Sequence, residues 1–263
     1  MAIIQFVLTL FLLGTVYVRM VRRETPEPVS RAQAVLPVVF GIIAVPVSFL
    51  LLALVGGLLN LAGISFTGLP AVPRSVVGAF FLAGFTEETA KLLFILLTVF
   101  LFRRKIRNVY EYILIGAAVG FGFALLEEFF YGADGILALF RLFTVGAHMI
   151  FGMIMAGHLG AAAWKKAAGT GGAALDSVLA VVLPMTIHTL FNASNVTNRL
   201  LNSDDDVEQL IGMLIALAAT VILFAAQFII IRRFKKNAEK YCGMILNRSD
   251  QSPASKAANV AGS

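Results

Sequence analysis

The chain has 263 residues, of which 59% are hydrophobic and 14% are charged, and its mean hydropathy is +0.88. Soluble domains are about half apolar and about a quarter charged, so this composition excludes an ordinary soluble protein and favours a multi-pass protein of the cell membrane. The formal net charge of +6 does not indicate a nucleic-acid partner, because the basic residues form short clusters between apolar runs.

Seven apolar runs are long enough to cross the roughly 30 Å hydrocarbon layer of a bilayer as helices. They cover residues 2–20, 34–62, 76–102, 112–132, 136–163, 175–192 and 210–231. The arginines near the first run follow it instead of preceding it, which is the reverse of a cleaved signal peptide. The sequence therefore predicts an all-α, polytopic membrane bundle of about seven transmembrane helices with a retained first helix.

The basic residues predict the orientation of this bundle. Of the 21 Lys and Arg residues, only Arg74, Arg141 and Arg199 lie in loops on one side, and Lys91 lies within a span. The others lie on the opposite side, so the positive-inside rule places the N-terminus outside and the C-terminus in the cytoplasm. Residues 1–236 are expected to form the transmembrane domain. Residues 237–263 are expected to form a polar, disordered cytoplasmic tail, and its lone Cys242 excludes an intrachain disulfide.

Three charged residues lie within the third predicted span. A charge at the centre of a transmembrane helix costs roughly 2.5 to 3.5 kcal/mol, so Glu87, Glu88 and Lys91 need a reason to be there. On a helix Lys91 lies about 40° from Glu87 and about 60° from Glu88 and can pair with either. A structural ion pair accounts for one carboxylate and leaves the second in excess, which favours a functional site.

Two more carboxylates, Glu127 and Glu128, lie near the outer end of the fourth span. Gly116 and Gly120 point within about 20° of Glu127 and allow a neighbouring helix to approach closely, so Glu127 is expected to face the bundle. Glu128 points about 100° away and is expected to reach toward the headgroups.

The histidines lie in the fifth and sixth spans. His148 precedes a stripe of small residues at intervals of four, and its estimated depth matches that of Glu87. His188 and Asn192 are spaced i, i+4 and therefore project from one helix face. His158 is expected at the cytoplasmic edge, outside the site. The remaining groups all fall in the outer half of the membrane, so we expect one shared cavity there.

Such a cavity has the parts needed to activate water. A desolvated glutamate can act as a general base, and an imidazole with an amide can stabilise an oxyanion. Neither a nucleophile elbow nor an HExxH motif is present, which argues against serine, cysteine and zincin-type hydrolysis. Two histidines plus carboxylates can still hold zinc, so a zinc ion is left open as a cofactor. Its candidate ligands are Glu87, Glu127, His148 and His188.

Four ordered motifs resemble the PrsW family of intramembrane proteases, which is itself similar to the CAAX-type prenyl endopeptidases and to the Aph subunit of gamma-secretase. The motifs are EETAK at 87–91, GFALLEE at 122–128, RLFTVGAHMIFG at 141–152 and HTLFN at 188–192. The resemblance implies cleavage of a single-span membrane protein, such as an anti-sigma factor, near its extracytoplasmic face. It also implies that Glu87 is the base, that Glu88 supports it, and that His188 and Asn192 serve the oxyanion.

The CAAX-type enzymes carry a histidine where this chain has Glu127, so either Glu127 or His148 can assist Glu87, with Lys91 and Glu128 as supporting groups. Two other classes of function stay open. A noncatalytic scaffold or substrate-presenting subunit would keep intramembrane histidines without cleaving anything. A proton-coupled transporter would also use carboxylates and histidines, but it favours internal repeats that the sequence does not show. The expected partners are a single-span substrate and the lipid bilayer.

Overall fold

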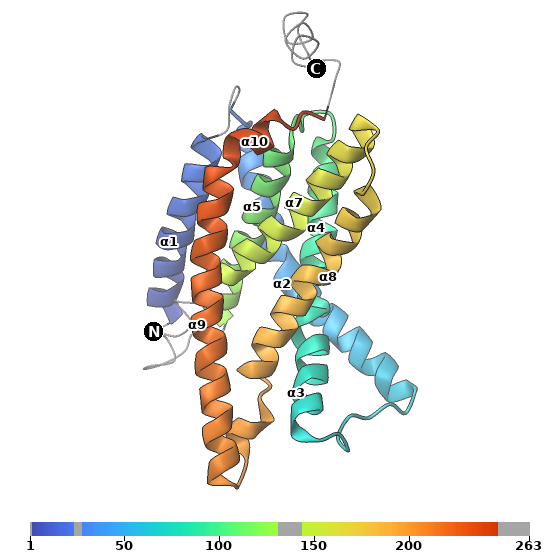
Figure 1. Cartoon of the computed structure of the whole chain (residues 1–263), viewed down its shortest axis with the longest axis vertical. Coiled ribbons are helices and arrows are strands. Elements are labelled where there is room, and N and C mark those ends of the chain that lie inside the picture. Colours follow the sequence, from blue (N-terminus) through green and yellow to red (C-terminus); the bar gives the residue numbers. More distant parts are fainter. Residues whose placement is uncertain (1, 24–27, 131–143, 247–263) are drawn as a thin grey trace, which may run out of the picture.

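The computed structural model describes residues 2–23, 28–130 and 144–246, and within these ranges every long element is a helix (Figure 1). Two short elements differ from the α-helices, because η1 (Phe80–Gly84) is π-helical and η2 (Arg199–Asn202) is a 3-10 turn. The α-helices are α1 (Ala2–Arg22), α2 (Arg31–Leu61), α3 (Ala71–Ala79), α4 (Thr86–Phe102), α5 (Val109–Phe130), α7 (Gly146–Ala168), α8 (Ala173–Ser194), α9 (Asp206–Lys236) and α10 (Ala238–Gly243).

Five of the described helices, α2, α5, α7, α8 and α9, are long and apolar enough to cross a membrane. The third predicted span is helical over most of its length, but η1 divides it into segments of 9, 5 and 17 residues. The predicted start of the fifth span, 136–143, lies outside the described residues, and α7 begins at Gly146. The chain is thus an all-helical membrane protein, while the count of about seven spans stays a prediction.

When α3, η1 and α4 are counted as one segment, successive long helices from α1 to α9 run in alternating directions, so charges far apart in sequence gather at two ends (Figure 1). The basic end holds the start of α5, the α7–α8 turn and α10, with Arg103, Lys105, Lys165, Lys166 and Arg233. The acidic end holds η2 and the residues 204–208 that begin α9. This grouping matches the expected distribution of charge, and which end faces the cytoplasm stays a prediction.

Helix α5 lies at the centre of the bundle because two neighbours approach its backbone closely. A Cβ atom added to Gly41 of α2 would lie 2.1 Å from the carbonyl oxygen of Val119, and one on Gly116 would lie 2.0 Å from that of Gly152 in α7. Only glycine permits such approaches between backbones. The predicted close-packing faces of α5 and α7 are therefore confirmed, and nearly all of α5 is buried.

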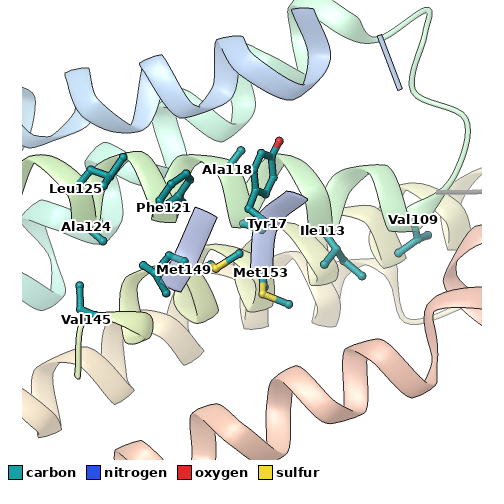
Figure 2. Close-up of a cluster of buried hydrophobic side chains, with 12 residues drawn as sticks. Tyr17, Val109, Ile113, Ala118, Phe121, Ala124, Leu125, Val145, Met149 and Met153 are labelled. Atoms are coloured by element: carbon teal, nitrogen blue, oxygen red, sulfur yellow. The ribbon is translucent and has the colours of Figure 1, made fainter. Parts of the chain in front are cut away.

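The main hydrophobic cluster joins α1, α5 and α7 (Figure 2). Tyr17 of α1 packs against Phe121 of α5 with ring centroids 6.0 Å apart, and Met149 and Met153 of α7 complete the contact. The Tyr17 hydroxyl donates a hydrogen bond to the carbonyl oxygen of Ala34, which satisfies its polar atom. This cluster fixes α7, and therefore His148, against α5.

The beginning of the C-terminal tail is folded, which corrects the prediction of disorder from residue 237. Ala238 is 1% exposed in α10, and Tyr241 packs on Phe234 with centroids 5.8 Å apart. The next residues pair with the α4–α5 turn, where the Leu246 amide donates to the Arg107 carbonyl at 2.8 Å. The prediction rested on the polar composition of this segment, which does not reveal contacts with residues distant in the sequence. The rest of the predicted tail, 247–263, lies outside the described residues.

Candidate active site

The π-helical turn η1 delivers two glutamates to the site. The Phe85 amide donates to the carbonyl oxygen of Phe80 at 2.7 Å, five residues back, and α4 then begins at Thr86. A Cβ atom on Gly84 would lie 2.0 Å from Thr189 Oγ1, so only glycine lets η1 pack this closely on α8. Such π-helical turns occur frequently at functional sites. Here the turn brings Glu87 and Glu88 against α8.

Glu88 is committed to two strong contacts. Its Oε1 atom lies 2.6 Å from Lys91 Nζ and accepts a hydrogen bond from His188 Nδ1 at 2.7 Å. Glu88 and Lys91 are both 0% exposed. A buried ion pair needs such additional hydrogen bonds to offset the cost of desolvation. Glu88 therefore neutralises Lys91 and orients the His188 ring.

Glu87 differs from Glu88 because its Oε2 atom forms no direct hydrogen bond with Lys91 or His188. Glu87 Oε2 lies 3.7 Å from Lys91 Nζ, and it has no hydrogen-bond partner among the described residues although it is buried. The same atom lies 3.9 Å from His188 Nε2 and 4.0 Å from His148 Nδ1. These separations exceed direct hydrogen-bond distances. Glu87 Oε2 therefore lies between three nitrogen atoms and forms a hydrogen bond with none of them.

His148 is held between a carboxylate and an ammonium group. Its Nε2 atom contacts Glu127, and its Nδ1 atom lies 3.0 Å from Lys91 Nζ. An ionised carboxylate only accepts hydrogen bonds, so Nε2 carries the hydrogen and Nδ1 presents a lone pair. By the same reasoning His188 donates from Nδ1 to Glu88 and presents the lone pair of Nε2. His188 thus presents the Nε2 lone pair 3.9 Å from Glu87 Oε2, whereas the lone pair of His148 Nδ1 accepts from Lys91.

A cavity of about 150 Å³ lies among these groups, with lining residues from α2, α4, α5, α7 and α8. Six of the residues predicted for the site line it, namely Glu87, Glu127, Glu128, His148, His188 and Asn192. The predicted convergence on one cavity is confirmed, whereas the catalytic roles stay predictions. The other two, Glu88 and Lys91, lie behind the cavity wall and hold His188 and His148 from there.

The expected position of Glu128 near the headgroups is wrong. Glu128 is 2% exposed and lines the same cavity as Glu127. Glu128 does point about 100° away from Glu127 on the helix. Because α5 is surrounded by protein on nearly every side, that direction still faces the bundle. His158 lies apart from this cavity, as expected, and hydrogen-bonds Asp176 at 2.9 Å.

Aromatic residues that the sequence reasoning missed complete the site. Phe123 lies 4.1 Å below Lys91 Nζ in a cation–π contact and stacks near the His148 ring at 5.1 Å. Phe151 packs on the His188 ring at 5.1 Å. The sequence spacing could have identified both residues. Phe123 lies four residues before Glu127, and Phe151 lies three residues after His148, so each shares a helix face with a predicted site residue.

Glu87, His148 and His188 form a group that can hold a metal ion, with ligand atoms within 4.8 Å of one another. Two histidines and one glutamate are a familiar ligand set of catalytic zinc. Zinc ligands about 2.0 to 2.1 Å from the ion stand roughly 3.4 Å apart, and the distances from Glu87 Oε2 to the two imidazoles, 3.9 and 4.0 Å, are close to this. The residues therefore fit such an ion in donor type and approximate spacing.

The surroundings of the two imidazoles also fit a metal site. Histidine ligands usually donate their second ring hydrogen to a carboxylate, and Glu88 and Glu127 accept in this way. Glu127, which was predicted as a possible ligand, is thus placed as a partner of His148 and is not in the ligand group. Lys91 opposes metal binding, because its ammonium lies 3.7 Å from Glu87 Oε2 and repels a cation.

Comparison with known proteins identifies the family. The family model for PrsW family intramembrane metalloproteases matches residues 30–229, which include all of the site residues. Comparisons with curated proteins and with solved structures return no match. The resemblance to CAAX-type and Aph proteins stays a prediction. Since the match covers most of the chain and the whole cavity, the chain belongs to the PrsW family of intramembrane metalloproteases.

Proposed function

We propose that this protein hydrolyses a peptide bond of a single-span membrane protein, with Glu87 as the carboxylate that takes the proton from water. The observation that carries this proposal is the position of Glu87 Oε2, which is buried at the cavity without a hydrogen-bond partner among the described residues. A general base must have an oxygen available to a water molecule. Glu88 Oε2 also has no hydrogen-bond partner among the described residues, but Glu88 is 0% exposed and does not line the cavity, so water in the cavity reaches Glu87 and not Glu88.

The tautomer of His188 supports a division of roles between His188 and Asn192 at the substrate carbonyl. Neutral His188, whose Nδ1 hydrogen goes to Glu88, presents a lone pair at Nε2 and can donate there only after it takes up a proton. The Asn192 amide is a donor in every state and lines the cavity one turn further along α8. We therefore assign the oxyanion first to Asn192, and to His188 once Nε2 is protonated.

If a metal ion takes part, zinc is the ion that this donor set favours, and Glu87, His148 and His188 would hold it. Glu87 would then be a ligand and not the base, so this form is an alternative to the one proposed above. When bound, such an ion supplies Lewis acidity, which polarises a carbonyl group and makes water more acidic. Lys91 would then keep its contact with Glu88, while its hydrogen bond to His148 Nδ1 competes with metal binding. Lasting inhibition by a chelator that added zinc reverses supports this form, and indifference to the chelator supports the metal-free glutamate.

The cavity walls support a transmembrane segment as substrate. Apolar side chains from α2 and α8, including Phe49, Leu52 and Phe191, lie beside the polar groups. Phe49 is 44% exposed, and the later part of α2 projects from the bundle (Figure 1). A cleavage segment rich in apolar residues can therefore contact these walls and present one peptide bond to Glu87.

The experiment is incubation of the purified, liposome-embedded protein with a panel of single-span membrane proteins. The wild type should cut at least one of them into two fragments, and Glu87→Gln should cut none, because the amide is nearly isosteric but cannot take a proton from water. Glu239→Gln, at an exposed position of α10 at the opposite end, is the matched control and should cleave normally. If Glu87→Gln cleaved at the wild-type rate, the assignment would be wrong and the scaffold function would be the better one.

A further inference from the structure

A second cavity, of about 420 Å³, lies at the basic end, far along the bundle from Glu87. It is formed by α7, α8, α9 and α10, and Figure 1 shows that α8 leans away from α9 toward this end. Its apolar lining includes Ile154, Leu183 and Ile230. Its polar lining residues are His158, Asp176, Arg233, Asn237 and Tyr241. The cavity therefore has both apolar and charged groups in its lining.

The carboxylate in this cavity is already compensated. Asp176 Oδ2 lies 2.6 Å from Lys165 Nζ, and Asp176 Oδ1 accepts from His158 Nδ1 at 2.9 Å. Both oxygens are therefore engaged by cationic or donor groups. An anion entering the cavity meets an ion pair and not an unpaired negative charge.

Arg233 is the uncompensated charge. Its side chain is exposed and lines the cavity, and no carboxylate of the described residues forms an ion pair with it. Burial raises the pKa of the Tyr241 hydroxyl and the positive charge of Arg233 opposes that rise, which indicates that the guanidinium lies near Tyr241. Further cations at the same end, including Lys166 and Lys236, make the potential around the cavity positive.

We propose that this cavity binds an anionic phospholipid from the leaflet at the basic end, with its phosphodiester on Arg233 and an acyl chain along Ile154, Leu183 and Ile230. Guanidinium is the side-chain group best suited to bind a phosphodiester through two hydrogen bonds. Basic pockets between transmembrane helices are a recognised form of anionic lipid site. The apolar wall favours a lipid over a free phosphate ion, and the net positive charge favours an anionic headgroup over a zwitterionic one.

This site would tie α9 to α7 and α8 at the end of the bundle opposite the cleavage site. Helix α9 exposes many large apolar side chains, such as Ile222, Phe228 and Ile229, and buries only four of its residues. A lipid seated between α8 and α9 fills space that side chains leave open. The site is therefore separate from the hydrolytic groups and does not depend on the function proposed for them.

The test is lipid binding by the full-length protein, measured by native mass spectrometry with phosphatidylglycerol and with phosphatidylcholine. The wild type should retain phosphatidylglycerol more tightly, and Arg233→Gln should weaken its binding about tenfold or more, because a charge-assisted hydrogen bond is lost. Arg232→Gln removes the same charge from the neighbouring position, which does not line the cavity, and should stay within about twofold. Leu183→Trp fills the apolar part and should also weaken binding.

Several results would overturn the proposal. Equal binding of the two lipids would exclude recognition of the anionic headgroup. Equal losses in Arg233→Gln and Arg232→Gln would indicate general surface charge, and unchanged binding by Leu183→Trp would exclude an acyl chain from the cavity. Displacement of the lipid by inorganic phosphate at the same concentration would show that the site takes the free ion.

Discussion

Gly152→Ala should disturb the cleavage site without touching it. A Cβ atom at Gly152 would lie 2.1 Å from the Gly116 carbonyl oxygen, whereas ordinary contacts begin at 3.4 Å. The nearest atoms, the carbonyl oxygen and carbon of Gly116, belong to the backbone and cannot rotate away. Helices α5 and α7 must therefore separate by about 1 Å, which costs about 1 to 3 kcal/mol of stability. His148 lies one turn before Gly152 and contacts Glu127 across the same interface. A misplacement of about 1 Å can cost about 10² in rate.

The assay is the cleavage rate in liposomes, read beside the thermal unfolding of the same samples. Gly57→Ala in the exposed half of α2 is the matched control, because a Cβ atom there has nothing within 4 Å. It should leave cleavage unchanged and shift stability by no more than about 1 kcal/mol. A Gly152→Ala protein with wild-type cleavage and wild-type stability would refute the role given to the α5–α7 contact.

Three further predictions concern the ion pair, the oxyanion and the topology. Lys91→Met should lower the free energy of unfolding in detergent by about 3 to 5 kcal/mol, because buried Glu88 loses its partner at 2.6 Å. Adding Glu88→Gln should recover part of that loss. A Lys91→Met protein as stable as wild type would contradict the pairing. Asn192→Ala should keep residual cleavage, about 10² to 10³ slower in a single-turnover assay, and full activity would remove Asn192 from the oxyanion. Reporter fusions after Arg107 and after Asp206 should read opposite sides of the membrane, with Arg107 cytoplasmic; the same side for both would overturn the orientation.

The sequence carried enough information to predict the site because its polar residues are expensive in a membrane and follow helical spacing. His188 and Asn192 lie four residues apart, and this spacing predicted one shared helix face, which lines the cavity. The small residues of α5 and α7 marked the interface between those helices, as Gly116 and Gly152 demonstrate. Local periodicity determines these features, so they can be derived without tertiary structure.

Features that depend on neighbours in space could not be derived in this way. Glu128 is buried because α5 is enclosed on nearly all sides, which no single helical wheel reveals. The π-helical turn before Glu87 depends on the contact between Gly84 and α8, and α10 depends on packing of Tyr241 on Phe234. The choice of Lys91 between two glutamates also needed distances, since both were within reach on the helix.

The central claim is that Glu87 takes the proton from water and that His188, whose Nε2 atom lies 3.9 Å from Glu87 Oε2, acts in the same step. The measurement that tests it most directly is the single-turnover cleavage rate of Glu87→Gln, His188→Gln and the double variant, each checked for wild-type unfolding behaviour. Groups that act as a unit are strongly non-additive. Each single change should therefore slow cleavage by about 10² to 10⁴, and the double variant should be no slower than the slower single one. Losses that multiply, or a Glu87→Gln protein that cleaves at the wild-type rate, would contradict the claim.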